Sequence, residues 1–144
     1  MTSSDPLRTI RGHCLCGAVS FQARGPFRPV VACHCNECRR FSGSAWNATA
    51  AKRDNLTIEG EEHLRWFALN EHARRGFCGT CGSSLFFDPK ARDYVAIGAG
   101  ALEKPTGLEL GVHIWVGEKG DYYEIGDGVR QVSDSAHGLT FSEG

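Results

Sequence analysis

Seven cysteines in three tight groups constrain this 144-residue chain more than any other feature of its sequence. The groups are Cys14-Leu15-Cys16-Gly17, Cys33-His34-Cys35-Asn36-Glu37-Cys38 and Cys78-Gly79-Thr80-Cys81-Gly82. Because seven is an odd number, disulfide bonds alone cannot use every thiol. Residues 1–11 contain no apolar run of the kind that directs secretion, so we expect a cytoplasmic protein, in which clustered cysteines are more often metal ligands than disulfides.

The short gaps within each group require the chain to bend there. Tetrahedral zinc holds thiolate sulfurs roughly 3.8 Å apart, whereas side chains on one face of a flat strand are about 6.7 Å apart. Glycine supplies the freedom to bend, since Gly17 follows Cys16 and Gly82 follows Cys81, where a knuckle turn needs a positive φ. Such a knuckle also directs backbone N–H groups at the sulfurs, which offsets their charge.

The outer groups together supply four thiolates, the ligand set of a closed structural zinc site. Its ligands would be Cys14, Cys16, Cys78 and Cys81. The middle group supplies three thiolates, Cys33, Cys35 and Cys38, and a tetrahedral ion held by them keeps one open position, as in catalytic zinc sites. We therefore expect two zinc ions. The sequence by itself also allows the Cys14/Cys16 pair to join Cys33 and Cys35.

Other interpretations of the middle group remain open. Cys35 and Cys38 have the spacing of a redox pair, although the chain lacks the βαβ pattern of thioredoxin-like proteins. The group could also be a second structural site completed by a further ligand, for which the candidates are His34, His13, His113 and Glu37. We expect His34 to point away from a shared metal, at the surface or behind the ligands, and His13 and His113 to lie in the core or at its rim.

Short apolar stretches separated by glycine, proline, aspartate and asparagine favour an all-β fold. Apolar and polar residues alternate over 19–23, 56–58 and 112–116, and this period of two indicates strands. The other predicted strands are 30–33, 46–50, 64–69, 85–87 and 94–98. The only helical piece expected is 36–41, ended by Ser42-Gly43. This pattern predicts one mainly antiparallel domain with little helix, and a loose polar tail over 133–144.

Charge and hydropathy exclude two classes of partner. A net charge of -1 and a pI near 6.6 give no basic surface for nucleic acid, and the least polar stretch, 94–102, is too short to span a bilayer. We interpret the local basic pairs Arg39-Arg40 and Arg74-Arg75 as solvated surface. Most aromatic residues are expected to pack in the core, but Phe41 and Trp46 follow the middle cysteine group directly and are candidates to line a pocket beside it.

Four stretches of the sequence resemble a known family. They are Gly12-His13-Cys14-Leu15-Cys16-Gly17-Ala18-Val19, Cys33-His34-Cys35-Asn36-Glu37-Cys38-Arg39-Arg40, Ser42-Gly43-Ser44 and Phe77-Cys78-Gly79-Thr80-Cys81-Gly82-Ser83. In order and spacing, from about residue 11 to about residue 132, they are similar to the glutathione-dependent formaldehyde-activating enzyme family, which also includes centromere protein V.

The resemblance implies a β-tent fold of stacked antiparallel sheets with zinc knuckles, in one domain over residues 1–144. It implies that the four outer cysteines hold a structural zinc and that Cys33, Cys35 and Cys38 hold an active-site zinc. The family often has a lysine and a tryptophan after a His-Ile pair. Here His113-Ile114 is present but Gly120-Asp121-Tyr122-Tyr123 replaces the tryptophan part, so the pocket wall is expected to differ.

The cysteines and the resemblance together predict a zinc-dependent carbon–sulfur lyase-type enzyme similar to S-(hydroxymethyl)glutathione synthase. Zinc held by three thiolates is a poor Lewis acid for water but suits a soft sulfur ligand. Our hypothesis is that glutathione or a similar thiol binds at the open position and that its sulfur adds to the carbonyl carbon of formaldehyde or a related small aldehyde. The alternative is a non-catalytic zinc-stabilised module that carries thiols or binds a protein partner.

The substrate would lie beside the middle cysteine group. The candidate substrate-binding residues are Arg39, Arg40, Phe41, Ser42, Gly43 and Trp46. Arg39, Arg40 or Lys52 could contact the carboxylates of a peptide thiol. No side chain stands out in the sequence as a general base.

Overall fold

In a computed structural model, which describes residues 5–135, the chain forms two β-sheets with one short α-helix. The strands are β1 Thr9–His13, β2 Ser20–Arg24, β3 Val30–Cys33, β4 Trp46–Lys52, β5 Leu56–Glu59, β6 Leu64–Phe67, β7 Ala73–Cys78, β8 Ser84–Pro89, β9 Tyr94–Gly98 and β10 Leu110–Ile114. The α-helix is α1 Asn36–Ser42, and short 3-10 helices cover Arg53–Asn55, Glu61–His63, Ala99–Ala101 and Val116–Glu118.

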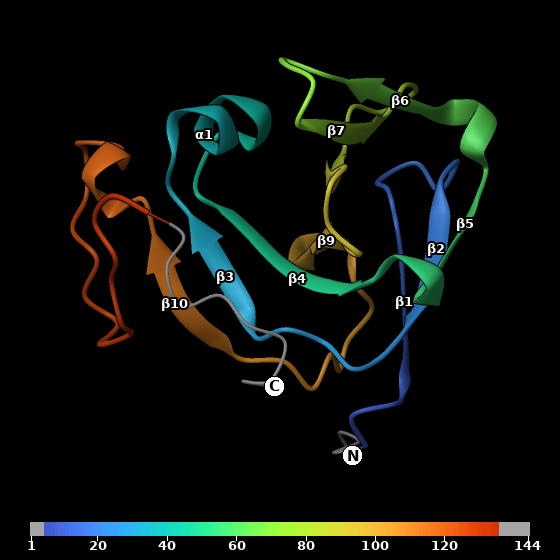
Figure 1. Ribbon diagram of the computed structural model, residues 1–144, viewed down its shortest axis with the longest axis horizontal. Helices are drawn as coiled ribbons and strands as arrows, with labels where there is room; N and C mark the ends of the chain where they lie inside the picture. Colours follow the sequence, from blue (N-terminus) through green and yellow to red (C-terminus); the bar gives the residue numbers. More distant parts are fainter. Residues whose placement is uncertain (1–4, 136–144) are drawn as a thin grey trace.

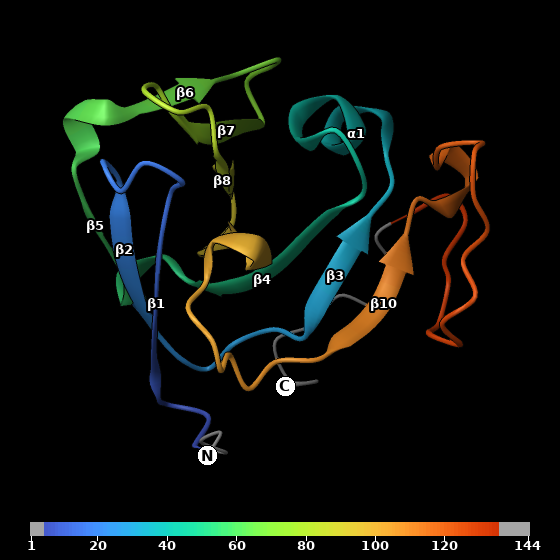
Figure 2. The ribbon, with the colours of Figure 1, turned by 180° about the vertical axis from the view of Figure 1, so that it is seen from behind.

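The smaller sheet has the order β1-β2-β5, and the larger has the order β10-β3-β4-β9-β8-β7-β6. All neighbouring strands are antiparallel except β3 and β10, which run parallel. The smaller sheet lies at one side of the molecule and β3 with β10 at the other, while β4 crosses the middle (Figure 1), and the view from behind gives the same arrangement (Figure 2). The structure thus confirms the predicted all-β fold of stacked sheets.

Alternation along the central strands places two of the cores on opposite faces of the larger sheet, and a third, smaller cluster lies at β3 and β10. On β9, Val95 and Ile97 pack in the core that the larger sheet shares with the smaller one, whereas Ala96 packs on the opposite face. The first core includes an edge-to-face contact between Phe21 and Phe86, whose ring centroids are 5.2 Å apart. Each phenylalanine buried there contributes roughly 1.5–3 kcal/mol.

The second core lies between the larger sheet and α1. Its sheet residues are mostly small, because Ala48 and Ala50 of β4 and Ala96 of β9 form this face. Cys38 of α1 and Trp46 of β4 complete its buried part. The alanines leave room beside the sheet, and the middle cysteine group occupies this side of the molecule.

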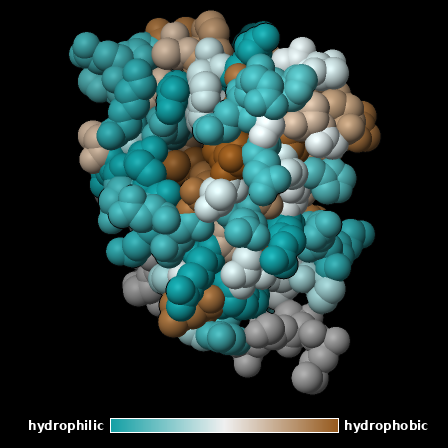
Figure 3. Space-filling view, turned by 90° about the vertical axis from the view of Figure 1, so that its right-hand side faces the viewer, coloured by the Kyte–Doolittle hydropathy of each residue, from teal (hydrophilic) through white to brown (hydrophobic). Residues whose placement is uncertain are grey.

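The outer surface is largely polar. The face turned toward the viewer in Figure 3 is mainly hydrophilic, and apolar side chains show in a hollow near its centre. None of the helices described for this chain has the length and the apolar composition needed to cross a bilayer.

The predicted helix is confirmed. It spans Asn36–Ser42 and ends at Gly43, which has φ 89° and donates its N–H to the carbonyl of Arg39 at 2.7 Å. A left-handed residue at this position is what glycine adopts without strain.

Two strands were not predicted from the sequence. β1 contains few large apolar residues, since its inward positions are Ile10 and Gly12. β7 reads Ala-Arg-Arg-Gly-Phe-Cys, a polar pattern interrupted by glycine. A Cβ at Gly76 would lie 3.0 Å from the Trp66 ring, so the glycine makes room for this aromatic side chain on the neighbouring strand.

The predicted strand over 112–116 is too long. β10 ends at Ile114, because Trp115 has φ 56° and a 3-10 helix follows over Val116–Glu118. A left-handed tryptophan is a backbone outlier that breaks the pleat. The strand predicted over 64–69 likewise ends at Phe67.

Part of the predicted tail is fixed to the domain. The backbone N–H of Gly117 donates to the carbonyl of Ser133 at 2.8 Å, and Val116 donates to Val132 at 3.0 Å. The remainder of the predicted tail, residues 136–144, lies outside the described residues.

Candidate metal centres

The four outer cysteines come together where the two sheets meet. Their sulfur atoms all lie within 4.8 Å of one another, and two of the separations, Cys14 to Cys16 and Cys16 to Cys78, are 3.7 and 3.8 Å. These values match the roughly 3.8 Å between thiolates on tetrahedral zinc. Cys14 follows β1 of the smaller sheet and Cys78 ends β7 of the larger sheet. Cys14 and Cys16 are therefore grouped with Cys78 and Cys81, and not with the middle cysteines.

Both turns have the predicted knuckle geometry. Gly17 has φ 84° and donates its N–H to the carbonyl of Cys14, and Gly82 has φ 80° and donates to the carbonyl of Cys78. Backbone N–H groups also point at the sulfurs, with Val19 N 3.3 Å from Cys14 Sγ and Cys81 N 3.4 Å from Cys78 Sγ.

The chemistry of this donor set fits a metal that binds thiolates. Hydrogen bonding by the Ser83 hydroxyl, together with backbone N–H groups, lowers the pKa of the Cys81 thiol to about 5. All seven cysteines are free, so no disulfide competes for these sulfurs.

The middle cysteines form a second group, whose three sulfurs also lie within 4.8 Å of one another. Cys33 ends β3, Cys35 caps the N-terminus of α1, and Cys38 lies in the first turn of α1. The backbone N–H of Cys38 donates to Cys35 Sγ at 3.4 Å, so the Cys35 side chain caps α1 and lies close to its first turn. No histidine or carboxylate of residues 5–135 joins either group as a ligand.

Cys35 ionises most readily in this group. Hydrogen bonds from the Cys33 and Cys38 thiols lower its pKa to about 2, and the N–H of Cys38 and the charge of Arg75 act in the same direction. The same contacts raise the pKa of Cys33, because one sulfur of a close set keeps its proton when no cation is present. A divalent cation would relieve this competition, which fits a metal site.

Arg75 is a site residue that the sequence did not reveal. Its Nη1 lies 3.6 Å from Cys38 Sγ and its Nη2 lies 3.4 Å from Glu37 Oε1. The guanidinium also lies over the rings of Phe41 and Phe87, at 5.4 and 4.7 Å from their centroids. Its side chain is only 12% exposed, so the prediction that the Arg74-Arg75 pair is solvated surface is wrong for Arg75. Arg74 instead pairs with Asp88.

A cavity of about 190 Å³ opens beside the middle cysteines. All three of these cysteines line it, together with Trp46, Trp115 and two arginines, Arg28 and Arg75. Trp46 was predicted to line a pocket here, and Trp115 reaches the cavity through its left-handed backbone at the end of β10.

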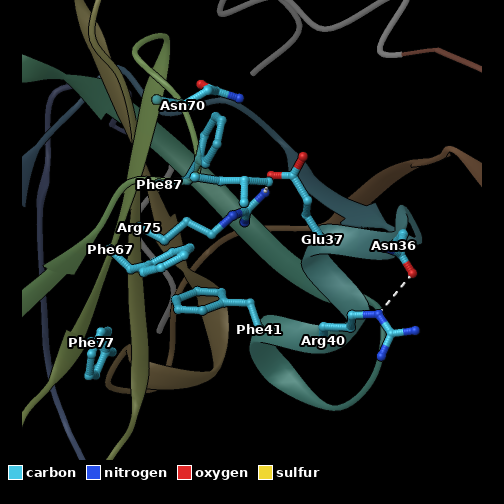
Figure 4. A pocket seen from close by; sticks show the side chains of 11 residues that line it. Asn36, Glu37, Arg40, Phe41, Phe67, Asn70, Arg75, Phe77 and Phe87 are labelled. Carbon is cyan, nitrogen blue, oxygen red and sulfur yellow. Dashed lines mark hydrogen bonds and ion pairs between the residues drawn. The ribbon is translucent and has the colours of Figure 1, made fainter.

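A larger groove of about 580 Å³ lies next to this cavity, between α1 and the β6–β7 hairpin (Figure 4). Arg75 and Phe87 line both spaces. The rest of the groove is formed by aromatic, aliphatic and polar side chains, namely Asn36, Glu37, Arg40, Phe41, Phe67, Leu69, Asn70, Ala73 and Phe77. Phe67 and Leu69 are more than half exposed, so the groove has an apolar wall that meets water.

Of the other candidate substrate-binding residues, two line the groove and the rest do not. Arg40 and Phe41 line the groove, and the Phe41 ring meets Trp46 edge-on at 5.6 Å. Arg39 points elsewhere, since its Nε donates to the carbonyl of Glu118 and its Nη2 to Asn36 Oδ1. Ser42 and Gly43 end the helix, with the Ser42 hydroxyl donating to carbonyls of Cys38 and Ser44. Lys52 is at the other end of β4, near Asp93.

The histidines considered as possible ligands, His34, His113 and His13, form hydrogen bonds with groups other than the cysteine sulfurs. His34 is buried, with only 2% of its surface exposed, and its Nε2 lies 2.9 Å from Nδ1 of His113. His113 Nε2 lies 2.7 Å from Asp127 Oδ2, and the Tyr123 hydroxyl lies 3.1 Å from His34 Nδ1. With an ionised Asp127, each N–H and O–H in this row of four hydrogen-bonded side chains meets an acceptor while both imidazoles stay neutral. Burial lowers the pKa of His34 in agreement with that state.

This network ties three segments behind the middle cysteines. His34 lies between two of them, His113 belongs to β10, and Tyr123 and Asp127 follow the 3-10 helix. The Gly120-Asp121-Tyr122-Tyr123 segment, in which the sequence departs from the family's usual pattern, therefore supports the loop of the middle group through Tyr123. His13 lies exposed at the end of β1, where its Nδ1 is 2.7 Å from the Cys14 carbonyl.

Comparison with known proteins identifies the family of this chain. A protein of Schizosaccharomyces pombe, named as an uncharacterized lyase, is 24% identical over 115 residues, which cover 79% of this chain and 83% of that protein. The crystal structure of a Rhodobacter sphaeroides protein matches with a TM-score of 0.56 at 25% identity, covering 65% of this chain and 88% of the other. The family model described as "Glutathione-dependent formaldehyde-activating enzyme" matches residues 9–118, and the chain belongs to this family.

Proposed function

We propose that this protein is a zinc-dependent carbon–sulfur lyase-type enzyme that joins a thiol, glutathione or a similar peptide, to formaldehyde or a related small aldehyde. The observation that carries the proposal is the set of three sulfurs, within 4.8 Å of one another, at the wall of a cavity where residues 5–135 supply no fourth ligand. A zinc ion held by Cys33, Cys35 and Cys38 would bind a thiol sulfur at its open position and favour the thiolate form.

A second zinc is proposed for the four outer cysteines. That group is closed and joins the two sheets, so its role is structural. We therefore propose two zinc ions per chain, and a reducing compartment such as the cytoplasm as the place of action, because thiolate ligands must stay reduced.

The groove beside the cavity supports a peptide thiol as substrate. Its aromatic wall offers apolar contact, and Arg40 at its edge could pair with a carboxylate. Arg75 lies between the groove and the sulfurs, so its guanidinium can hold the peptide and balance the negative charge of the thiolates. Trp46 and Trp115 add aromatic surface to the wall of the cavity.

The proposed step needs no oxidant. The sulfur attacks the carbonyl carbon, a carbon–sulfur bond forms, and the electron pair of the carbonyl bond passes to oxygen, which takes up the proton that the thiol has lost. The reverse reaction breaks the same bond, which is the lyase direction.

Exchange spectroscopy tests the proposal. With zinc-loaded protein, the NMR exchange rate between formaldehyde and its glutathione adduct should exceed the uncatalysed rate, and Cys35→Ser should abolish the excess while the protein stays folded. Elemental analysis should find two zinc equivalents in the wild type. An exchange rate that the protein leaves unchanged, together with tight binding of glutathione, would favour the non-catalytic thiol-carrying module instead.

A further inference from the structure

Arg28 is a buried cation that forms no ion pair with a carboxylate of the described residues. Only 6% of its surface is exposed, and the hydrogen bonds of its side chain to described residues come from Nη2, to the carbonyls of Ala48 at 3.2 Å and Thr49 at 3.4 Å. Its Nε is buried without an acceptor, and no carboxylate of residues 5–135 forms an ion pair with it. A buried guanidinium is strongly disfavoured unless an anion or several acceptors meet it.

The guanidinium belongs to the same cavity as the middle cysteines. Arg28 lines the space of about 190 Å³ together with all three of them. Burial, the larger effect, lowers the pKa of Arg28, whereas Tyr94 and Cys33, which line the same cavity, act to raise it. The two carbonyls of β4 hold the side chain in place, so it is preorganised to receive a ligand.

The second arginine of this cavity shows what Arg28 lacks. Arg75 comes from β7, donates toward Cys38 Sγ at 3.6 Å, and is paired with Glu37 at 3.4 Å. Arg75 thus contacts a sulfur and a carboxylate directly, whereas the guanidinium of Arg28 has hydrogen bonds only to carbonyls of the described residues and keeps its Nε without an acceptor. The volume of the cavity would hold several water molecules, whereas formaldehyde has only two heavy atoms.

We propose that Arg28 binds the carboxylate of the carbonyl substrate, so that this cavity selects a small aldehyde acid of the glyoxylate type over a neutral aldehyde. The inference rests on the proposed function and names the substrate class of the same site. Arginine suits this role because its planar guanidinium donates to both oxygens of a carboxylate. Arg28 is then a specificity-determining residue in contact with the substrate.

The step balances with the carboxylate as a spectator. The thiol sulfur attacks the aldehyde carbon, a carbon–sulfur bond forms, and the electron pair of the carbonyl bond moves to oxygen. That oxygen takes up the proton given by the thiol, and the product is a 2-hydroxy acid that carries the thioether sulfur on the same carbon. Nothing is oxidised or reduced, and no further reactant is needed.

A comparison of three aldehydes tests the inference on zinc-loaded protein with glutathione. Glyoxylate and methylglyoxal have the same number of heavy atoms but differ in charge, and formaldehyde serves as the minimal substrate. Exchange of each aldehyde with its glutathione adduct is measured relative to the uncatalysed rate. We expect the wild type to favour glyoxylate over methylglyoxal by about tenfold or more, as one charge-assisted pair provides.

Substitutions of Arg28 should change this preference. Arg28→Gln should lower the acceleration for glyoxylate by about 10- to 100-fold and leave that for formaldehyde within about twofold, and Arg28→Lys should fall between. Arg24→Gln is the matched control, because Arg24 is an exposed arginine of β2. Calorimetry of glyoxylate and methylglyoxal binding to the zinc-loaded wild type gives a readout that needs neither turnover nor a folded variant.

The possible outcomes separate this inference from the proposed function. Turnover of formaldehyde without any preference for glyoxylate overturns the role of Arg28 and leaves the proposed function standing. An equal loss for all three aldehydes in Arg28→Gln also overturns it, because the arginine would then only support the site. Turnover of none removes the proposed function, and calorimetry then decides about Arg28: equal binding of the two isosteric aldehydes would refute the anion site.

Discussion

In both cysteine groups the sulfurs lie within 4.8 Å of one another, but the hydrogen-bond donors around the sulfurs differ between the groups. In the four-cysteine group, the sulfurs meet backbone N–H groups of Val19, Thr80 and Cys81 at 3.3 to 3.4 Å. In the three-cysteine group, the backbone N–H of Cys38 meets Cys35 Sγ at 3.4 Å, and the side chain of Arg75 meets Cys38 Sγ at 3.6 Å. The first group therefore has mostly main-chain contacts plus one serine hydroxyl, Ser83 Oγ at 3.2 Å from Cys81 Sγ, whereas the second has a charged side chain.

This difference favours a structural role for the four-cysteine group and a ligand-binding role for the three-cysteine group. The first group is held mainly by backbone N–H groups in glycine-containing turns, and it joins the two sheets. A side-chain wall can be altered residue by residue, and here it faces a cavity and a groove. We therefore expect substitutions at the first group to affect folding, and substitutions around the second to affect ligand affinity.

The largest expected difference is between Cys78→Ser and Cys35→Ser. Structural zinc contributes on the order of 10 kcal/mol, which is comparable to the whole stability of a domain. Cys78→Ser should therefore give unfolded or insoluble protein, whereas Cys35→Ser should remain folded with one zinc equivalent fewer. Circular dichroism melts and elemental analysis measure both. Equal damage from the two substitutions would show that both groups are structural.

The next effect concerns Arg75, whose guanidinium touches the three-cysteine group. Arg75→Met should weaken glutathione binding by about 10- to 100-fold, the range for losing a hydrogen bond to a charged group. The melting temperature should change little, because methionine keeps apolar contact with Phe41 and Phe87. Arg39→Gln is the control and should leave the affinity within about twofold, since Arg39 bonds to Asn36 and Glu118 instead. An equal loss in both variants would exclude a specific role for Arg75.

A smaller effect is the pH dependence of thiol binding at the three-cysteine group. Zinc selects the thiolate, so binding releases a proton, and affinity should rise about tenfold per pH unit below the thiol's pKa near 8.5. The serine analogue of glutathione should show no such slope. Calorimetry at several pH values between 6 and 8 measures it. A slope shared by thiol and hydroxyl would mean that the sulfur is not the group that binds.

The sequence could predict what depends on neighbouring residues. The knuckle turns at Gly17 and Gly82 and the end of α1 at Gly43 follow from local spacing, and the structure confirms their positive φ angles. The grouping of Cys14 with Cys78 required chain topology, because spacing alone also allowed Cys14 and Cys16 to join the middle cysteines.

The arginines of the cavity could not be predicted in the same way. Arg75 contacts Cys38, which lies 37 positions earlier in the sequence. It belongs to β7, a strand that was not predicted because its sequence is polar and interrupted by glycine. Arg28 stands just before β3, and its place in the cavity follows from its bonds to β4, which only the fold provides. The burial of His34 depends likewise on His113, 79 positions away.

The smallest effect compares one substitution at each group, Gly82→Ala and Gly43→Ala. Both glycines have a positive φ, 80° and 89°, and a Cβ at either position would have no atom within 4 Å, so only backbone strain is introduced. Each change should lower the free energy of unfolding by about 1 kcal/mol. Gly82 donates to the Cys78 carbonyl inside the closed knuckle, so Gly82→Ala should also speed the loss of the tight zinc to a chelator. Gly43→Ala, at the end of α1, should leave that rate unchanged. Urea denaturation and chelator competition measure both quantities, and an identical zinc-loss rate in the two variants would show that the main chain does not control the closed group.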